Sequence, residues 1–309
     1  SGYNIPHTGE DLKMVYSLRA HNKLDANRLE TYIQDTYKFM SSGQHTFFTL
    51  NYGVRFSHWN FNRETIFSPR VSLSIVPPFN NNVTFRFATG LYYQAPFFKE
   101  LRDTTTVEGT TYASLNRKIK SQRSIHFIAA YDYKFKLNDR PYKFTAEAYY
   151  KALPDNQPYR ENNVKVVYDA SQQCSGHSMG VDLKLYGEFV PGTDSWVSLS
   201  LMDTKINFNG VSIPMPTDQR YALNLYFTDY FPGTDKWRMS LKLAFADGLP
   251  FGPPHKELSS MQFRAPAYKR ADIGMSYRLF DREKSEKKKS VFKNVWLGID
   301  CLNLFGINN

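Results

Sequence analysis

The feature that most constrains the fold is a strict alternation of apolar and polar side chains, which is clearest in SIHFIAAYDYKFKL (124–137). One side of this stretch is apolar throughout, whereas the other carries His126, Asp132, Lys134 and Lys136. Side chains of a β-strand point alternately to its two faces, so a period of two indicates a strand with one apolar face. YKFTAEAYYK (142–151) has the same rhythm, and the short LNDRP between the two stretches predicts a β-hairpin.

The same rhythm recurs along the chain and predicts an all-β fold of about twelve antiparallel strands. In the strands where it is clearest, the apolar side carries no charged residue. Aromatic residues make up 16% of the chain, a composition that favours pleated sheets over helical bundles. The predicted strands are 28–39, 46–57, 67–76, 83–92, 122–137, 142–151, 178–190, 196–207, 219–231, 236–246, 268–279 and 293–304.

Short turns alternate with longer connections between these strands. Turns such as PPFNNN, NDRP, PGTDS and PGTDK are short, whereas Tyr93–Ser121, Ala152–His177 and Asp247–Ala267 are long. One end of the sheet is therefore expected to carry the short turns and the other end the long loops. This arrangement is typical of an up-and-down β-barrel.

One turn sequence is used twice, in VPGTDSW, which ends at Trp196, and in FPGTDKW, which ends at Trp237. Proline followed by glycine suits a type II turn, since Gly192 and Gly233 can take positive φ. Each tryptophan then falls at the start of the next strand, where an amphipathic indole suits a membrane–water boundary. We expect both tryptophans to belong to a membrane-interface belt.

Strand length and the second face favour a membrane barrel over a soluble two-layer sheet. Most predicted strands have about 10–14 residues, compared with about 5–6 in soluble sheets and about 9–11 in tilted membrane strands. The face opposite the apolar one suits a watery lumen and would make a poor core. It carries Arg55, Arg70, Arg86, Lys134, Lys143, Glu147, Asp182, Lys184, Arg220, Lys242, Asp272 and Arg278.

Composition and motifs exclude several other classes of function. The net charge is +10, but the basic run REKSEKKKS (282–290) contains no aromatic residue, so it predicts a solvated turn and no nucleic-acid partner. The seven histidines are scattered, and no metal, cofactor or catalytic spacing is present, which predicts a protein that is not an enzyme. Cys174 and Cys301 are expected to be free thiols, with a disulfide between them as the alternative.

Four stretches, YIQDTYKF, FSPRVSLSIVPP, YYQAPFFKEL and IDCLNLFGINN, resemble the barrel half of TonB-dependent outer-membrane transporters. The resemblance implies a 22-strand barrel that encloses an N-terminal plug and is energised through TonB in the periplasm. We therefore expect residues 1–309 to form one domain, a partial outer-membrane β-barrel of about twelve strands that lacks the plug and the final strand.

The resemblance also implies a function in the outer membrane of a Gram-negative cell. The expected activity is energised import of a scarce nutrient, a siderophore, cobalamin or glycan. The expected partners are the lipid bilayer, the protein's own plug, TonB and the small-molecule or glycan ligand. A passive porin and a soluble all-β carbohydrate-binding protein remain as alternatives.

Two groups of residues are candidates for binding. The loop that begins YYQAPFFKELRD offers aromatic and polar contacts to a ligand, unless it packs against neighbouring loops; its candidates are Tyr92, Tyr93, Gln94, Phe97, Phe98 and Arg102. On the lumen face, Arg55, Arg70 and Arg86 are expected either to attract an anionic substrate such as a ferric siderophore or to pair with acidic residues of the plug.

Overall fold

The computed structural model describes residues 2–4, 13–20, 22–41, 43, 45–97, 100–107, 110–162, 165–168, 174–208, 210–252, 263–281 and 291–308. Within these ranges every regular element is a strand, and no helix there could cross a membrane. The strands are β1 (Gly2–Asn4), β2 (Lys13–Ala20), β3 (Arg28–Met40), β4 (Phe47–Trp59), β5 (Glu64–Val76), β6 (Val83–Gln94), β7 (Arg102–Val107), β8 (Thr110–Leu115), β9 (Gln122–Leu137), β10 (Arg140–Asn156), β11 (Tyr159–Asn162), β12 (Lys165–Tyr168), β13 (Cys174–Val190), β14 (Thr193–Phe208), β15 (Val211–Pro214), β16 (Tyr221–Tyr230), β17 (Trp237–Ala246), β18 (Pro250–Phe251), β19 (Phe263–Arg264), β20 (Tyr268–Asp281) and β21 (Asn294–Cys301).

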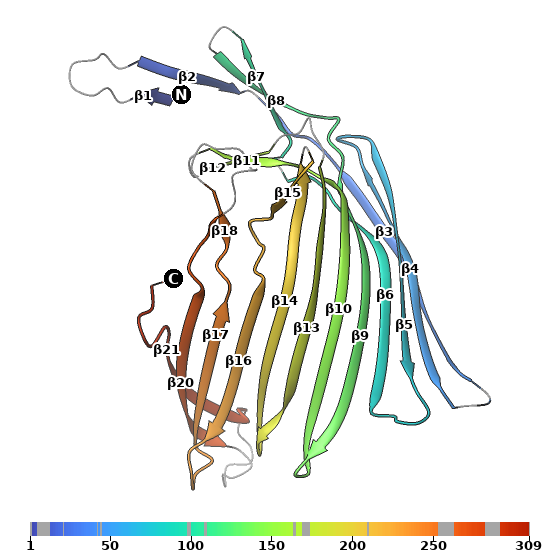
Figure 1. Cartoon of the computed structure of the whole chain (residues 1–309), viewed down its shortest axis with the longest axis vertical. Coiled ribbons are helices and arrows are strands. Elements are labelled where there is room, and N and C mark those ends of the chain that lie inside the picture. The colour runs from blue at the N-terminus through green and yellow to red at the C-terminus, as the bar shows by residue number, and fades with distance from the viewer. Residues whose placement is uncertain are drawn as a thin grey trace.

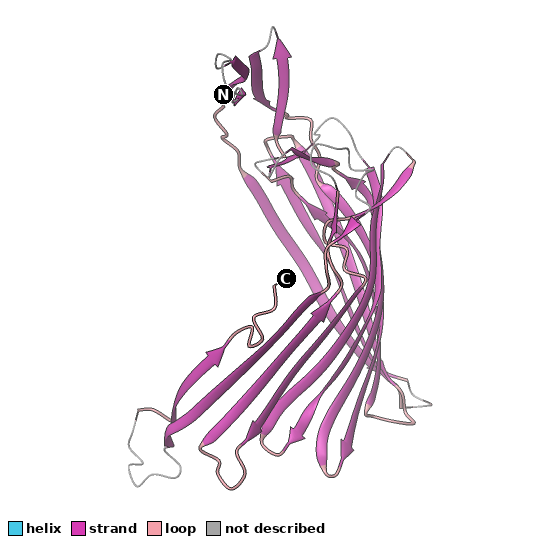
Figure 2. Cartoon of the chain, turned by 60° about the vertical axis from the view of Figure 1, so that its left-hand side comes forward, coloured by secondary structure: helices cyan, strands magenta, loops and turns pink. Residues whose placement is uncertain are grey.

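Twelve long strands form one continuous antiparallel sheet, and the short β15 pairs with β14 as its thirteenth strand (Figure 1). The order along the sheet is β21-β20-β17-β16-β14-β13-β10-β9-β6-β5-β4-β3, so each long strand lies next to the long strand that follows it in the sequence. Figure 2 shows that the sheet is strongly curved, with a convex outer face and a concave inner face. The predicted all-β, up-and-down antiparallel fold is confirmed.

All twelve predicted strands are present. In the hairpin of β9 and β10, Phe127 pairs with Tyr150 and Tyr133 pairs with Phe144, so the predicted apolar side forms one face. Both β10 and β13 have 17 residues and extend further than predicted toward the long loops. The alternation stops in these extensions because they contain polar residues such as Asp155. A pattern of apolar positions therefore does not show that the strands continue.

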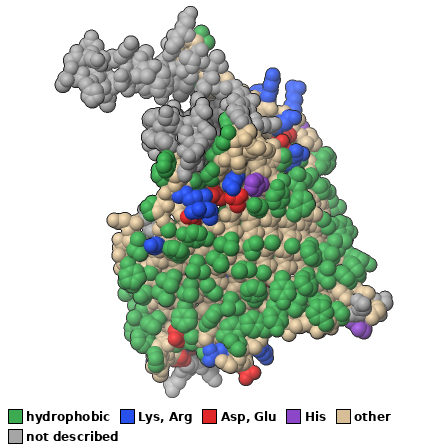
Figure 3. All heavy atoms as spheres, viewed as in Figure 1, with side chains coloured by type: hydrophobic (Ala, Val, Ile, Leu, Met, Phe, Trp, Pro, Cys, Tyr) green, Lys and Arg blue, Asp and Glu red, His purple; other side chains and the backbone are tan. Residues whose placement is uncertain are grey.

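The convex face is apolar and exposed. Figure 3 shows its apolar side chains gathered in a broad band across the sheet, with charged side chains above and below the band. Large side chains in this band, such as Phe127, Tyr150 and Met179, are between 43% and 52% exposed. A soluble β-sandwich would bury such a face against a second layer. A continuous exposed apolar band is instead what a lipid-facing barrel wall requires.

An acidic residue near the middle of β3 interrupts the apolar face. Asp35 on β3 pairs with Tyr52 on β4 and shares its outer face. The Tyr52 hydroxyl donates a hydrogen bond of 2.9 Å to the Asp35 carboxylate, which also accepts one of 2.8 Å from the Thr36 backbone N–H. Because a bare carboxylate is costly in an apolar environment, these two donors are what allow it on this face.

The two PGTD sequences fold into different corners. Gly192 and Gly233 have φ values of 78° and 79°, and Thr234 N–H donates to the Phe231 carbonyl, as the predicted turn requires. In the first corner β14 begins directly after the turn, at Thr193, whereas residues 231–236 form a longer loop before β17.

The difference between the corners places the two tryptophans on opposite faces. Trp237 pairs with Tyr277 on the outer face and is 41% exposed. Trp196 pairs with Tyr186 and Tyr226, and the Lys184 ammonium lies over its ring at 5.3 Å. Trp196 therefore lies on the inner face, and its predicted place in a lipid-interface belt is wrong. The position of a tryptophan after a turn does not fix its face unless the turn length is also known.

Most long connections lie at the end of the sheet opposite the short turns. The predicted division has two exceptions: the β4–β5 connection at the long-loop end is only residues 60–63, and the β20–β21 connection at the short-turn end spans residues 282–293. Phe61 in this connection, Leu101 and Ile119 form a small buried cluster that fixes the base of the 95–121 loop. Above it, β1, β2, β8 and β7 form a separate four-stranded sheet.

Four charged residues, Asp218, Arg220, Asp247 and Arg264, pair with one another near the start of β16 and the end of β17. This group is called the clasp below. The Arg220 guanidinium donates to both carboxylate oxygens of Asp247, at 2.6 and 3.2 Å. Arg264 pairs with Asp218 and, at 3.1 Å, with Asp247. Asp218 is 1% exposed and also accepts a hydrogen bond of 2.7 Å from the Thr204 N–H. The two carboxylates are buried and paired, and removing one partner of a buried charge is costly.

The assignment of faces predicts unequal effects of arginine at adjacent positions near the middle of β14. Leu199→Arg places a charge on the apolar face and should lower the free energy of unfolding by about 2–4 kcal/mol. Ser200→Arg places it on the inner face opposite Asp182 and should change stability little. Urea unfolding of the full-length protein in lipid vesicles measures both, and equal losses would contradict the assignment.

The clasp should loosen in acid. Hydrogen bonding to Arg220 holds the pKa of Asp247 below its ordinary value of 3.8, so its stabilising effect is present above about pH 4 and is lost as the pH falls further. Hydrogen exchange of the amides near residues 218–222 and 247–250, corrected for intrinsic rates, should therefore rise below about pH 4. Asp247→Asn should show the faster exchange already at pH 7, whereas Asp194→Asn, near the start of β14 at the opposite end of the sheet, should not.

Candidate functional site

The candidate site lies on the inner face of β4–β6, where an arginine lies between two glycines of the neighbouring strands. Arg70 on β5 pairs with Gly53 on β4 and with Gly90 on β6. A Cβ at Gly90 would lie 3.0 Å from the Arg70 Cγ, and a Cβ at Gly53 would lie 2.6 Å from the Ile33 carbonyl oxygen. The absence of a side chain at Gly90 therefore leaves the Arg70 side chain room on the β6 side, whereas Gly53 allows the close approach of β3.

The side chains of Arg70, Tyr92 and His126 form a stack, with Arg70 at one end. Its guanidinium carbon lies 4.3 Å from the centroid of the Tyr92 ring, and that ring stacks on His126 with 4.2 Å between centroids. His126 on β9 pairs with Gly90, so it lies on the same inner face. A cation on an aromatic face is attracted by about 0.5–2 kcal/mol, which fixes the position of the guanidinium and leaves its N–H donors free to bind.

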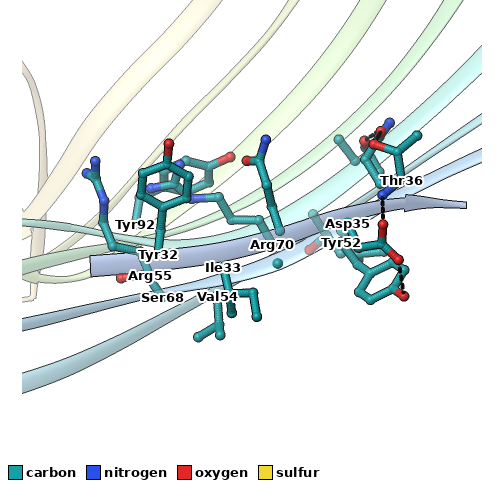
Figure 4. A pocket seen from close by; sticks show the side chains of 17 residues that line it. Tyr32, Ile33, Asp35, Thr36, Tyr52, Val54, Arg55, Ser68, Arg70 and Tyr92 are labelled. Atoms are coloured by element: carbon teal, nitrogen blue, oxygen red, sulfur yellow. Dashed lines mark hydrogen bonds between the residues drawn. The ribbon is translucent and has the colours of Figure 1, made fainter. Parts of the chain in front are cut away.

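A second arginine lies beside this stack. Arg55 on β4 pairs with Tyr32 on β3 and with Ser68 on β5, all on the inner face. Figure 4 shows the side chains of Tyr32, Arg55, Arg70 and Tyr92 on one side of the strands, and those of Val54 and Tyr52 on the other. These residues border a hollow of about 630 Å³. Because outer-face residues also line it, the hollow is an open recess at this edge of the sheet.

Arg55 and Arg70 differ from Arg86 in their pairing. Arg86 on β6 forms an ion pair of 2.7 Å with Asp132, which also contacts Lys143 at 3.2 Å and accepts a hydrogen bond from Thr145. Among the residues that the structure describes, neither Arg55 nor Arg70 forms an ion pair with an acidic side chain. The inner wall therefore presents two uncompensated positive charges beside an aromatic ring, while Arg86 is neutralised within the wall.

The aromatic candidates of the YYQAPFFKELRD segment do not form one surface. Tyr92, Tyr93 and Gln94 belong to β6, where adjacent side chains point to opposite faces. Tyr92 faces inward, whereas Tyr93 pairs with Arg123 on the outer face, so the expectation that both tyrosines contact one ligand is wrong. Gln94 is exposed at the end of the strand. Phe98 lies outside the described residues; Arg102 is in the backbone pairing of β7, but its side chain is not described.

Phe97 is held at the surface of the long-loop end. Its N–H donates a hydrogen bond of 2.8 Å to the carboxylate of Glu100, and the Glu100 N–H donates one of 2.9 Å to the Phe97 carbonyl. Leu101 next to it is 1% exposed in the small buried cluster, whereas the Phe97 side chain is 60% exposed. Burial raises the pKa of the Glu100 carboxyl group above its ordinary value. The loop thus buries the side chain of Leu101 and exposes that of Phe97 to solvent.

The sequence pattern did not reveal His126 and Tyr32 as parts of the site. Both lie in strands whose alternation was predicted correctly, but their contacts depend on which residues of neighbouring strands lie opposite them. The pair of glycines at the same level as an arginine was the one signal available, and it becomes visible only after the strands are aligned. No group of three or more metal-binding side chains occurs within the described residues.

The close backbone approach at Gly53 predicts a strong position effect of a single methyl group. Gly53→Ala places its Cβ 2.6 Å from the Ile33 carbonyl oxygen and should destabilise the protein by about 1–3 kcal/mol through overpacking. Gly43→Ala adds the same methyl group in a turn where no atom lies within 4 Å. Urea unfolding of both full-length variants should show a loss only for the first, and equal midpoints would disprove the packing at Gly53.

Comparison with known proteins identifies the family. The sequence model described as TonB dependent receptor-like, beta-barrel, matches residues 3–304. No curated protein matches the chain closely enough to be a relative.

Several solved structures share the fold. A variant of the ferric enterobactin receptor PfeA from Pseudomonas aeruginosa, in complex with enterobactin, has a TM-score of 0.61 and 17% identity, covering 91% of this chain and 40% of the receptor. The ferric-catecholate import receptor Fiu from E. coli K12 has a TM-score of 0.60 and 13% identity, with 91% and 41% covered. The outer membrane transporter YddB from Escherichia coli has a TM-score of 0.58 and 12% identity, with 91% and 47% covered.

The chain thus spans less than half the length of these structures, and at such identities the likeness concerns the fold. The family match covers the whole of the main sheet from β3 to β21. It agrees with the apolar convex face and with the resemblance in the sequence. The chain belongs to the TonB-dependent receptor-like β-barrel family.

Proposed function

We propose that this chain is part of the barrel wall of an energised importer in the outer membrane of a Gram-negative cell. The observation that carries the proposal is the pair of uncompensated cations, Arg55 and Arg70, beside Tyr92 on the polar inner face. Proteins of this family are transport proteins rather than enzymes. A cationic and aromatic recess on the inner wall suits recognition of a solute that passes along it.

The ligand class that best fits the recess is an anionic chelate with aromatic groups. Guanidinium groups bind anionic oxygens through charge-assisted hydrogen bonds, and Tyr92 and His126 offer aromatic faces. Two of the similar structures are receptors for ferric enterobactin or ferric catecholate, which supports an iron chelate as the ligand. A neutral glycan would make little use of two cations, and cobalamin is the remaining alternative among the nutrients expected from the resemblance.

Energisation through TonB follows from family membership in this proposal. It requires an N-terminal plug inside the barrel and a segment that TonB contacts in the periplasm. Acidic residues of the plug are the alternative partners of Arg55 and Arg70, because a plug carboxylate would accept hydrogen bonds from the same guanidinium groups as the ligand. The passive porin alternative requires neither a plug nor TonB, so uptake without energy would favour it.

Removing the two cations should weaken uptake of an anionic chelate. In cells that express the full-length receptor, Arg55→Gln with Arg70→Gln should lower uptake of radiolabelled ferric enterobactin at limiting concentration at least tenfold, because each lost charged hydrogen bond is worth about 1.5–3 kcal/mol. Lys184→Gln removes the same charge from a distant part of the inner face and should leave uptake unchanged.

Two further outcomes separate the alternatives. Uptake by the unaltered receptor should stop when TonB is deleted, and uptake that persists would contradict an energised importer. If the arginine variants retain ligand binding but their thermal unfolding temperature falls, the cations pair with the plug instead of the ligand. Equal uptake by the arginine variants and Lys184→Gln would reject the recess as the ligand site.

A further inference from the structure

The cationic and aromatic surface of the recess continues across the inner face beyond His126. Arg70 on β5 pairs with Gly90 on β6. His126 on β9 pairs with Gly90 on one side and with Lys151 of β10 on the other, so all four residues lie at one level of the wall. Lys151 is half-buried, and it forms no ion pair with an acidic side chain in the part of the chain that the structure describes. A third uncompensated cation therefore shares the level of Arg70.

Lys151 lies on an aromatic ring, as Arg70 does. Its Nζ is 4.9 Å from the centroid of the Tyr149 ring. That ring lies over Gly180 of β13, where a Cβ would come within 2.8 Å of the tyrosine Cζ. A glycine thus leaves space for a side chain along the wall here, as Gly90 does beside Arg70. The attraction to the ring places the ammonium and leaves its three N–H donors for a ligand.

The immediate surroundings of Lys151 on the inner face contain no carboxylate among the described residues. The positions around it on β9 and β13 are uncharged or basic: Ser124, His126, Ile128, Gly176, Ser178 and Gly180. Glu147 on the same face of β10 is four residues away, about 13 Å at about 3.3 Å per residue, and lies 3.8 Å from Arg86. An anionic group at the level of Lys151 is therefore attracted without repulsion from an adjacent acid.

We propose that Lys151 and the Tyr149 ring form a second subsite of the recess, which takes a second anionic arm of the same ligand. This inference rests on the proposed import of an anionic chelate. The backbones of β5 and β10 are three strand spacings apart, about 14 Å at about 4.8 Å each. Arg70 and Lys151 therefore suit separate anionic groups of one ligand rather than one small anion. The ligand class is a chelate with several anionic arms, one at the two arginines and another at Lys151.

Titration of the purified full-length receptor with ferric enterobactin tests the role of Lys151. Lys151→Gln should raise the Kd about tenfold, because it removes a charged hydrogen bond, whereas Lys151→Arg keeps the charge and should stay within twofold of the unaltered protein. Lys184→Gln is the matched control. Lys184 also lies over an aromatic ring, that of Trp196, but it pairs with Thr145, six residues along β10 from Lys151. This control should leave the Kd unchanged.

Chemical labelling of the unaltered receptor distinguishes a ligand contact from an effect on the fold. Saturating ferric enterobactin should slow the acetylation of Lys151 by acetic anhydride at least fivefold, as measured by mass spectrometry of chymotryptic peptides. Acetylation of Lys184 in the same sample should not change. Equal acetylation of Lys151 with and without the ligand, including a lysine that is unreactive in both, would overturn the second subsite.

Failure of the second subsite differs from failure of the proposed function. If Arg55→Gln with Arg70→Gln weakens binding while Lys151→Gln behaves like Lys184→Gln, the second subsite is rejected and the recess stands. If neither the arginine variant nor Lys151→Gln changes the Kd, the inner wall of β4–β10 is not the ligand site, and both proposals are rejected. A tenfold loss in Lys151→Gln that comes with a lower thermal unfolding temperature and an unprotected Lys151 would also reject the second subsite.

Discussion

Cross-strand hydrogen bonding of the backbone is the constraint on which the rest of this structure depends. In hydrocarbon, an N–H or C=O group without a partner costs several kcal/mol, so each spanning segment must be paired along its length. The ladder from β3 to β21 provides that pairing through the chain's own hairpins. Once the backbone is satisfied in this way, the side chains are divided between two faces, and each face must suit a different solvent.

The division into two faces explains why the recess on the inner wall is open and polar. A wall one strand thick has no interior, so a binding site on it is made of side chains that lie across neighbouring strands. Arg70 can lie along the wall because Gly90 adds no side chain beside it, and Tyr92 then holds its guanidinium. Selectivity on such a wall comes from the register of the strands, since the register decides which side chains share a level.

The sequence was sufficient to predict the strands but not the contacts between them. Alternation is a local property of each strand, so all twelve strands could be predicted before any pairing was known. The faces of residues near strand ends were less certain. Tyr93 points away from Tyr92 because both lie within β6, and Trp196 lies on the inner face because its turn is shorter than the one before Trp237. Contacts such as Tyr92 with His126 require the register, which the sequence pattern does not contain.

The cations of the inner face differ in whether they are paired with a carboxylate. On β6–β10, Arg86 is neutralised by Asp132, and on β20 the Arg270 guanidinium is paired with Asp272 at 2.8 Å. On β4 and β5 the cations of Arg55 and Arg70 have no such partner within the described part of the chain. A wall that needed charge only for solubility could place it anywhere on this face. Paired charges of this kind add little to the potential in the lumen, whereas Arg55 and Arg70 attract an anionic group toward β4 and β5.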